Sequence, residues 1–185
     1  DGAPLGSHGS KACQIDSIAQ SWAAFSGGER AKEGIKAALE RLYDRKKGLV
    51  RLFDPPFDPG EEQPGYIQAY PPGVRENGGQ YTHAAVWLAL ACLEEGMTGE
   101  GYAILHDLLP ETHPQGLYRA EPYVLPGDVC GAPPHMERGG WSWYTGAAGW
   151  YWQAVTDGLL GLRVREGRLT PAPKLPRSWS GWSAR

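Results

Sequence analysis

Apolar residues recur at helical spacing in two adjacent stretches near the start of the chain. Over residues 15–25 they follow a period of about 3.6 residues, which stops at Gly27-Gly28. Over residues 31–43 they occupy one helical face, while lysines, arginines and glutamates occupy the other. The pattern therefore predicts two consecutive helices, of which the second is amphipathic and half-exposed.

The same pairing recurs farther along the chain. Residues 81–93 are apolar on nearly all sides, which predicts a helix buried on most faces. Residues 99–109 form a shorter amphipathic pattern that Pro110 stops. A third buried helix is predicted over residues 144–160, where the small residues 146–149 allow close approach and the aromatic residues 150–152 fill volume.

Two long segments, residues 48–79 and 112–140, separate these helical pairs. Repeated prolines and glycines prevent a helix in both, so we predict long loops, which in a compact domain are usually functional. Residues 162–165 and 168–170 flank Glu166-Gly167 and predict a short β-hairpin. About three helical hairpins with long loops on one side predict a mainly α ring; the alternative is an ordinary α-helical domain with irregular loops.

Composition narrows the function classes. The chain has 185 residues, with 41% hydrophobic and 21% charged residues, which is typical of a globular protein despite 26 glycines and 16 prolines. Its formal net charge of −3 gives no basic surplus for nucleic acid or an anionic membrane. Three widely spaced cysteines indicate neither a disulfide framework nor a zinc site. Because the sequence also shows no signal peptide, we expect a cytoplasmic location.

One polar cluster lies where the first long loop runs into the predicted buried helix. It contains Arg75, Glu76, Asn77, Gln80 and His83. Such groups are costly to bury unless they pair with one another or meet a polar ligand. This segment is therefore a candidate binding site.

A second candidate segment, residues 139–146, enters the third predicted helix. Free backbone amides at a helix start, with the Thr145 hydroxyl and the unhindered Gly146, favour an anion. If both helix starts open onto one face, His83 and these amides converge on one phosphate or carboxylate. The alternative is that Thr145 is only a helix cap and His83 a satisfied core histidine.

The aromatic and acidic residues of the long loops indicate a sugar ligand. Indole faces stack on pyranose C–H groups and carboxylates accept hydrogen bonds from hydroxyls, so we assign sugar binding to a set of five residues: Glu76, Glu121, Asp128, Trp141 and Trp143. For the two tryptophans a packing role is the alternative. The remaining helix tryptophans, Trp22, Trp87, Trp150 and Trp152, are expected to fill the core. The other histidines, His8, His106, His113 and His135, show no metal spacing and are expected to be surface or loop residues, so no metal site is predicted.

Four segments of the chain, residues 15–22, 65–83, 121–124 and 138–146, resemble the C-terminal part of glycoside hydrolase family 94. This family comprises cellobiose, chitobiose and related β-glucoside phosphorylases, and the phosphorylase-like region of cyclic β-1,2-glucan synthases. The resemblance covers nearly the whole chain and is strongest to the synthase branch. It implies a partial (α/α)6 toroid, with residues 1–160 as its C-terminal half and residues 161–185 as the start of a truncated β-rich segment.

The resemblance also implies an inverting phosphorolysis that releases a sugar 1-phosphate. Phosphate is already a nucleophile, so this chemistry needs one general acid and groups that hold the anion, with inorganic phosphate as co-substrate and no cofactor. The family assigns phosphate binding to the positions of His83, Thr145 and Gly146, and donor-sugar binding to that of Glu76. The loop that contains Glu121 and Asp128 lines the sugar subsites.

In one respect the sequence departs from the family. The general acid is an Asp in a Trp-Asn-Asp type motif that lies upstream of the matching segment, and no such motif occurs here. We therefore expect a C-terminal fragment with no catalytic residue of its own, inactive alone, from a cytoplasmic protein or the cytoplasmic region of a larger inner-membrane protein. Its open ring is expected to pair with a second copy or a complementary chain.

Two other functions remain open from the sequence. The first is a non-catalytic carbohydrate-binding or assembly module, in which the loop tryptophans and Glu76 bind a β-glucan oligosaccharide without chemistry. The second is hydrolysis by two of the three acidic residues Glu76, Glu121 and Asp128.

Overall fold

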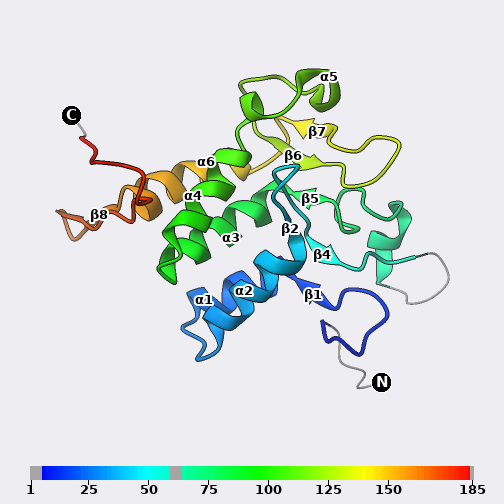
Figure 1. Ribbon diagram of the computed structural model, residues 1–185, viewed down its shortest axis with the longest axis horizontal. Helices are drawn as coiled ribbons and strands as arrows, with labels where there is room; N and C mark the ends of the chain where they lie inside the picture. Colours follow the sequence, from blue (N-terminus) through cyan, green and yellow to red (C-terminus); the bar gives the residue numbers. More distant parts are fainter. Residues whose placement is uncertain (1–5, 59–63, 184–185) are drawn as a thin grey trace.

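The computed structural model describes residues 6–58 and 64–183 (Figure 1). Its α-helices are α1 (Ser17–Phe25), α2 (Ala31–Leu42), α3 (Thr82–Glu94), α4 (Thr98–Asp107), α5 (Gln115–Tyr118) and α6 (Ala147–Gln153). Two 3-10 turns, η1 (Gly65–Ala69) and η2 (Pro110–Thr112), and a π-helical turn, η3 (Ala154–Leu159), complete the helical elements of the described residues. The strands are β1 (Ile15–Asp16), β2 (Tyr43–Asp44), β3 (Leu49–Val50), β4 (Phe53–Asp54), β5 (Gln80–Tyr81), β6 (Pro126–Val129), β7 (Gly139–Ser142), β8 (Leu162–Arg165) and β9 (Arg168–Pro171).

Helix α3 is the centre of the fold. It packs against α1, α4 and α6 (Figure 1). Because Val86, Leu88 and Leu93 are all fully buried, the prediction of a helix buried on most faces is confirmed. The two helical hairpins, α1–α2 and α3–α4, are also confirmed, whereas α6 continues into η3 and then into a β-hairpin. The chain is thus a mainly α, partial toroid.

Asp16 begins the first helix. Its Oδ1 accepts hydrogen bonds from the backbone N–H groups of Ile18 at 2.7 Å and Ala19 at 3.1 Å, which is the typical N-cap geometry. Burial raises the pKa of this carboxyl, and the two hydrogen bonds oppose that shift. Asp16 therefore has a structural role at the start of α1.

The predicted loops contain short strands that the sequence did not reveal. Strand β6 lies between β5 and β7 in an antiparallel sheet, with Tyr81 opposite Asp128 and Asp128 opposite Gly140. The prediction of a continuous loop over residues 48–79 and 112–140 was wrong in these places. Strands of two to four residues are too short to show an alternating pattern, and their pairing joins segments that are far apart in sequence.

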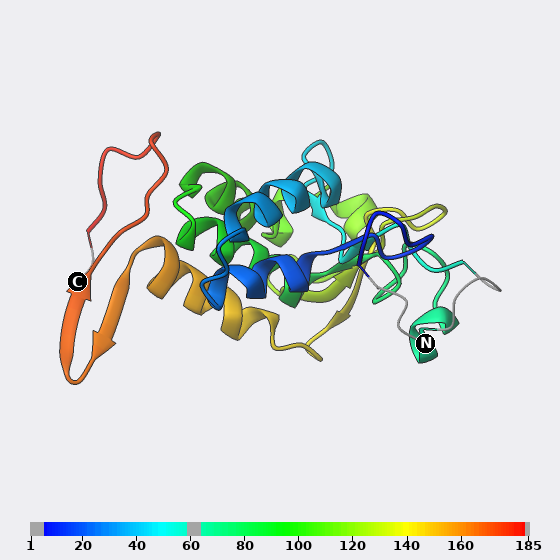
Figure 2. The same ribbon diagram turned by 90° about the horizontal axis from the view of Figure 1, so that it is seen from below.

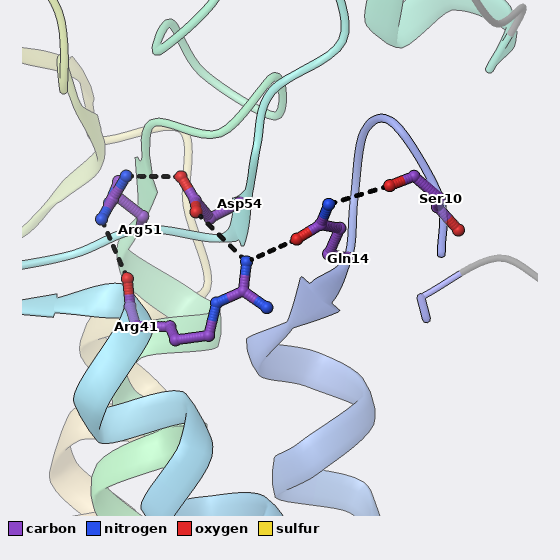
Figure 3. Close-up of polar contacts among 5 residues, drawn as sticks. All are labelled: Ser10, Gln14, Arg41, Arg51 and Asp54. Atoms are coloured by element: carbon purple, nitrogen blue, oxygen red, sulfur yellow. Dashed lines mark hydrogen bonds and ion pairs between the residues drawn. The ribbon is translucent and has the colours of Figure 1, made fainter. Parts of the chain in front are cut away.

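A polar network fixes strand β4 to α2 and to the segment before α1 (Figure 3). Arg41 donates to Oε1 of Gln14 at 2.9 Å and lies 3.6 Å from a carboxylate oxygen of Asp54. Arg51 donates to the other Asp54 oxygen at 2.5 Å and to the Arg41 carbonyl at 2.9 Å. Because β4 is held in this way, the long loop that follows it starts from a fixed position.

The β8–β9 hairpin is confirmed, and it lies at the far end of the helices from the β5–β6–β7 sheet (Figure 1, Figure 2). Its turn residues, Glu166 and Gly167, both have positive φ, at 51° and 74°, as a two-residue turn that matches strand twist requires. Lys174 donates to Glu94 of α3 at 2.8 Å and fastens the segment after the hairpin to the helices. Among the described residues, no helix is both long enough and apolar enough to cross a membrane.

The expectation for the helix tryptophans was correct only in part. Trp87 and Trp150 are partly buried between α3 and α6, but Trp22 is 48% exposed and Trp152 is 69% exposed. The third helix is therefore buried along one face only, on which Ala147 lies. The helical pattern shows that a face is apolar, whereas the packing partner present in the chain decides whether it is covered.

Candidate functional site

The β5–β6–β7 sheet brings the two candidate segments together. Strand β5 runs directly into α3, so His83 lies on the first turn of that helix. Tyr81, two residues before it, pairs with Asp128 of β6. Gly127 lies between β7 and the start of α6, since a Cβ there would be 3.2 Å from Cβ of Trp141 and 3.6 Å from Cβ of Thr145. Residues more than 50 positions apart thereby share one sheet.

His83 and Gly146 are direct neighbours. A Cβ built on Gly146 would lie 3.5 Å from Cε1 and 3.6 Å from Nδ1 of the His83 ring. The two helix starts do open onto the same face, as the sequence suggested. Any side chain at Gly146 would cover the edge of the imidazole, so glycine keeps that edge open.

The His83 ring is not a satisfied core histidine. Its Nε2 atom is buried and has no hydrogen-bond partner among the described residues. Burial lowers the pKa of the ring, so His83 is neutral at pH 7 with one nitrogen able to donate and the other able to accept. A buried polar atom without a partner is destabilising unless a ligand or water satisfies it.

Thr145 lies one residue before Gly146, the N-cap of α6, and still satisfies a backbone amide at the start of that helix. Its Oγ1 accepts a hydrogen bond from the Ala147 N–H at 3.0 Å. The hydroxyl proton remains available, because the oxygen acts as acceptor in this contact. Capping and ligand binding by Thr145 are therefore compatible.

A charged cluster lies beside these residues. Arg75 Nη1 is 3.5 Å from Oδ1 of Asp128, and Arg75 Nε is 3.5 Å from Oε2 of Glu76. These separations form ion pairs but are too long for good hydrogen bonds, and all four atoms are buried without a hydrogen-bond partner. The cluster therefore has unused hydrogen-bonding capacity that points to a polar ligand.

Asp128 is 6% exposed, and the pKa of its carboxyl is raised. Burial is the main cause, the nearby Glu76 carboxylate adds to the shift, and Arg75 opposes it. Gly140 leaves room beside it, because a Cβ there would lie 3.1 Å from Oδ1 of Asp128, a tight contact. The sequence assigned Glu76 and Asp128 to sugar binding but did not include Arg75, although Arg75 belongs to the same polar cluster.

The two loop tryptophans differ in environment. The Trp141 ring lies under the Arg75 guanidinium, with 4.6 Å from Cζ to the ring centroid, so one of its faces is already occupied. Trp143 is 67% exposed and donates from Nε1 to Glu121 Oε1 at 3.1 Å. Hydrogen bonds from Ser142 and Trp143 lower the pKa of Glu121, which therefore stays ionised.

Three residues of this region have left-handed backbones, which side chains other than glycine rarely adopt. They are Arg75 at φ 48°, Trp141 at 53° and Trp143 at 77°. Such conformations are strained and are concentrated at functional sites, where the surrounding structure maintains them. Here they belong to Arg75, which contacts Asp128 and Trp141, and to the two tryptophans of the loop.

Two members of the polar cluster are structural. Asn77 is fully buried and bonds to the backbone of Phe57 and Tyr70, while Gln80 accepts from the Val50 N–H at 2.8 Å. His113, expected on the surface or in a loop, lies in a loop but is buried. Within the described part of the chain, no three His, Cys, Asp or Glu side chains are placed to hold a metal ion.

Comparison with known proteins identifies one family for the chain. Residues 1–161 match the family described as the catalytic domain of the glycosyl hydrolase 94 superfamily. The whole chain is 46% identical to the cyclic β-(1,2)-glucan synthase NdvB of Rhizobium meliloti (strain 1021), of which it spans 7%.

More distant relatives are phosphorylases. Over 96% of its length the chain is 30% identical to the solabiose phosphorylase of Paenibacillus borealis, and spans 24% of it. Over 98% of its length it is 27% identical to the N,N′-diacetylchitobiose phosphorylase of Vibrio furnissii, and spans 23% of it. The chain thus covers less than a quarter of each of these relatives.

Proposed function

The chain belongs to the glycosyl hydrolase 94 superfamily, and from that premise we propose that it forms the phosphate-binding and donor-sugar part of an inverting β-glucan phosphorylase or cyclic glucan synthase-like enzyme. In this proposal His83, Thr145 and Gly146 bind inorganic phosphate. Glu76, Asp128, Glu121 and the loop tryptophans Trp141 and Trp143 bind a β-glucan oligosaccharide.

One observation carries the phosphate assignment. The half-buried His83 imidazole, whose buried Nε2 has no hydrogen-bond partner among the described residues, lies beside Gly146, where an added Cβ would be 3.5 Å from Cε1 of the ring. A phosphate at this point accepts a hydrogen bond from the imidazole and from backbone or hydroxyl groups of Thr145 and Gly146. The names of the relatives support an anionic co-substrate of this kind, since two of those compared are phosphorylases.

The charged cluster supports the sugar assignment. A pyranose hydroxyl can donate to Asp128 or Glu76 and accept from Arg75, which satisfies atoms that have no hydrogen-bond partner without ligand. The guanidinium keeps both carboxylates close to the ligand although they repel each other. Trp141 then acts chiefly by holding Arg75, and Trp143 offers an exposed ring beside the Glu121 carboxylate.

The chemical step follows from these roles. A phosphate oxygen attacks the anomeric carbon from the face opposite the leaving group, the glycosidic C–O bond breaks, and the departing oxygen takes a proton. The products are a sugar 1-phosphate with inverted configuration and a shortened glucan. The proton comes from a general acid that we assign to a part of the enzyme outside this chain.

Calorimetry on the 185-residue chain tests the phosphate site. We expect inorganic phosphate to bind to the chain and to strengthen the binding of β-1,2-linked oligoglucans. We expect phosphate binding to be lost in His83→Ala. The matched control is His106→Ala. His106 is exposed on α4, about 20 positions after His83 in the sequence. Oligoglucan binding that is indifferent to phosphate contradicts the proposal and supports a carbohydrate-binding module instead.

A turnover assay tests whether the general acid lies outside this chain. The chain alone is expected to release no sugar 1-phosphate from β-1,2- or β-1,4-glucosides, and no reducing sugar in the absence of phosphate. Robust phosphorolysis by the chain alone would show that the acid lies within it. Reducing-sugar release without phosphate would favour the hydrolytic alternative with two of Glu76, Glu121 and Asp128.

Pairing of the open ring is part of the same proposal. The exposed rings of Trp22 on α1 and Trp152 on α6 favour a second copy or a complementary chain that covers them. Light scattering coupled to size-exclusion chromatography measures this directly. A stable monomer whose mass is independent of concentration contradicts pairing with a second copy.

A further inference from the structure

Two tryptophans enclose the side of the His83 ring that faces the protein. Trp87, one turn after His83 on α3, meets the imidazole edge-to-face with centroids 4.5 Å apart. Trp150 approaches from α6 at 5.8 Å. The two indoles contact each other at 5.5 Å with perpendicular planes, so they form a continuous aromatic wall behind the histidine.

The same spacing occurs on both helices. Trp87 follows His83 by four residues on α3, and Trp150 follows Gly146 by four residues on α6, with the Trp150 N–H donating to the Gly146 carbonyl at 3.2 Å. Side chains at this spacing lean back toward the helix start and lie over the residue one turn earlier. The contact between the two indoles therefore joins the turn that carries His83 to the turn that carries Gly146.

We infer that the Trp87–Trp150 pair is the positioning element of this site: it sets the orientation of the His83 imidazole and its distance from the Gly146 backbone. The inference rests on the proposed phosphate site and names residues that act through His83 without touching the anion. The wall also excludes water from one side of the ring, which is consistent with the burial that lowers the pKa of His83.

The indole N–H of Trp87 allows the effect of its ring contact to be tested separately from that of a hydrogen bond. Its Nε1 atom is buried and has no hydrogen-bond partner among the described residues. Replacing Trp87 with Phe keeps an aromatic edge against the imidazole and removes an unsatisfied donor, whereas Leu removes the ring altogether. A positioning role by ring contact predicts that Phe is tolerated and Leu is not.

The test follows the Cε1–H signal of His83 by NMR in the full chain, first over a pH titration and then during addition of inorganic phosphate. We expect Trp87→Leu to move the His83 pKa up toward its ordinary value and to weaken phosphate binding about tenfold, the effect of misplacing one charge-assisted hydrogen bond. Trp87→Phe is expected to stay close to the parent chain in both measurements.

Trp179→Leu is the matched control, because that indole is partly exposed and packs edge-to-face on Tyr102 of α4, away from His83. Circular dichroism establishes that each variant is folded. If Trp87→Leu does not fold, Trp150→Leu tests the same contact from α6, since Trp150 touches both His83 and Trp87.

Unchanged His83 titration and unchanged phosphate affinity in a folded Trp87→Leu or Trp150→Leu overturn the inference. Equal losses in Trp87→Leu and Trp179→Leu also overturn it, since they indicate general loosening. If phosphate leaves the His83 signal of the parent chain unmoved, the proposed phosphate site fails. The shift of the ring pKa in Trp87→Leu then decides the positioning role by itself.

Discussion

Asn77 fastens the loop that carries Arg75 and Glu76, and its removal is the sharpest test of how that loop is held. The side chain is fully buried. Its Oδ1 accepts from the Phe57 N–H at 2.8 Å, and its Nδ2 donates to the carbonyls of Phe57 at 2.9 Å and Tyr70 at 2.8 Å. One amide therefore joins three points of the segment between β4 and β5.

Asn77→Ala removes all three hydrogen bonds and leaves one N–H and two carbonyls of the backbone without these partners. At about 1 kcal/mol for each bond, we expect a loss of about 3 kcal/mol in the free energy of unfolding. That is a large fraction of the roughly 5–15 kcal/mol that keeps an ordinary domain folded. The Arg75–Asp128 pair should loosen as well, because Arg75 lies two residues before Asn77.

Urea unfolding followed by tryptophan fluorescence measures the loss. The control is Gln68→Ala, which removes a single long contact of 3.4 Å to the Asp58 carbonyl on an exposed side chain and should cost less than about 0.5 kcal/mol. Asn77→Asp keeps the acceptor for Phe57 but turns a carboxylate toward two carbonyls, so it should destabilise at least as much as Ala. A loss below about 1 kcal/mol for Asn77→Ala would refute this account of the loop.

Three further predictions concern the site and its pH dependence. Gly140→Ala places a Cβ 3.1 Å from Asp128 Oδ1 and should weaken oligoglucan binding measured by calorimetry. It should also lower the free energy of unfolding by about 1 kcal/mol. The control Gly99→Ala, which has open space around it, should not destabilise the fold. Trp143→Phe removes the hydrogen bond to Glu121 and should raise the pKa of that carboxyl part of the way to its ordinary value in a ¹³C NMR titration, since Ser142 still donates; an unchanged titration would count against the contact. Burial lowers the pKa of both His83 and His113, so the folded chain binds fewer protons than the unfolded one below about pH 6.5. Their contribution to the free energy of unfolding is complete above that pH and is lost as the pH falls toward the pKa values of the folded state. The urea midpoint should therefore be lower at pH 5.5 than at pH 8. His113→Phe, which keeps the stacking on Tyr118, should reduce this difference.

Helix hairpins were predictable because their signal is local. The apolar period of residues 15–25, the glycines that end it and the all-round apolar character of residues 81–93 each determine an element without reference to the rest of the chain. The turn at Glu166-Gly167 was predictable for the same reason, since its backbone demands are met by the two residues themselves. The capping of α1 by Asp16 belongs to the same local class.

The sequence by itself determined where helices begin, and its motifs predicted which residues bind phosphate and sugar. Only the tertiary structure decided their partners: that His83 lies against Gly146, that Arg75 stands between Glu76 and Asp128, and that Trp141 stacks on Arg75. It also decided that Asn77 and Gln80 serve the backbone, and that Trp22 and Trp152 are exposed. The physical reason is that contacts between short strands and neighbouring helices join residues far apart in the chain, for which no local pattern exists.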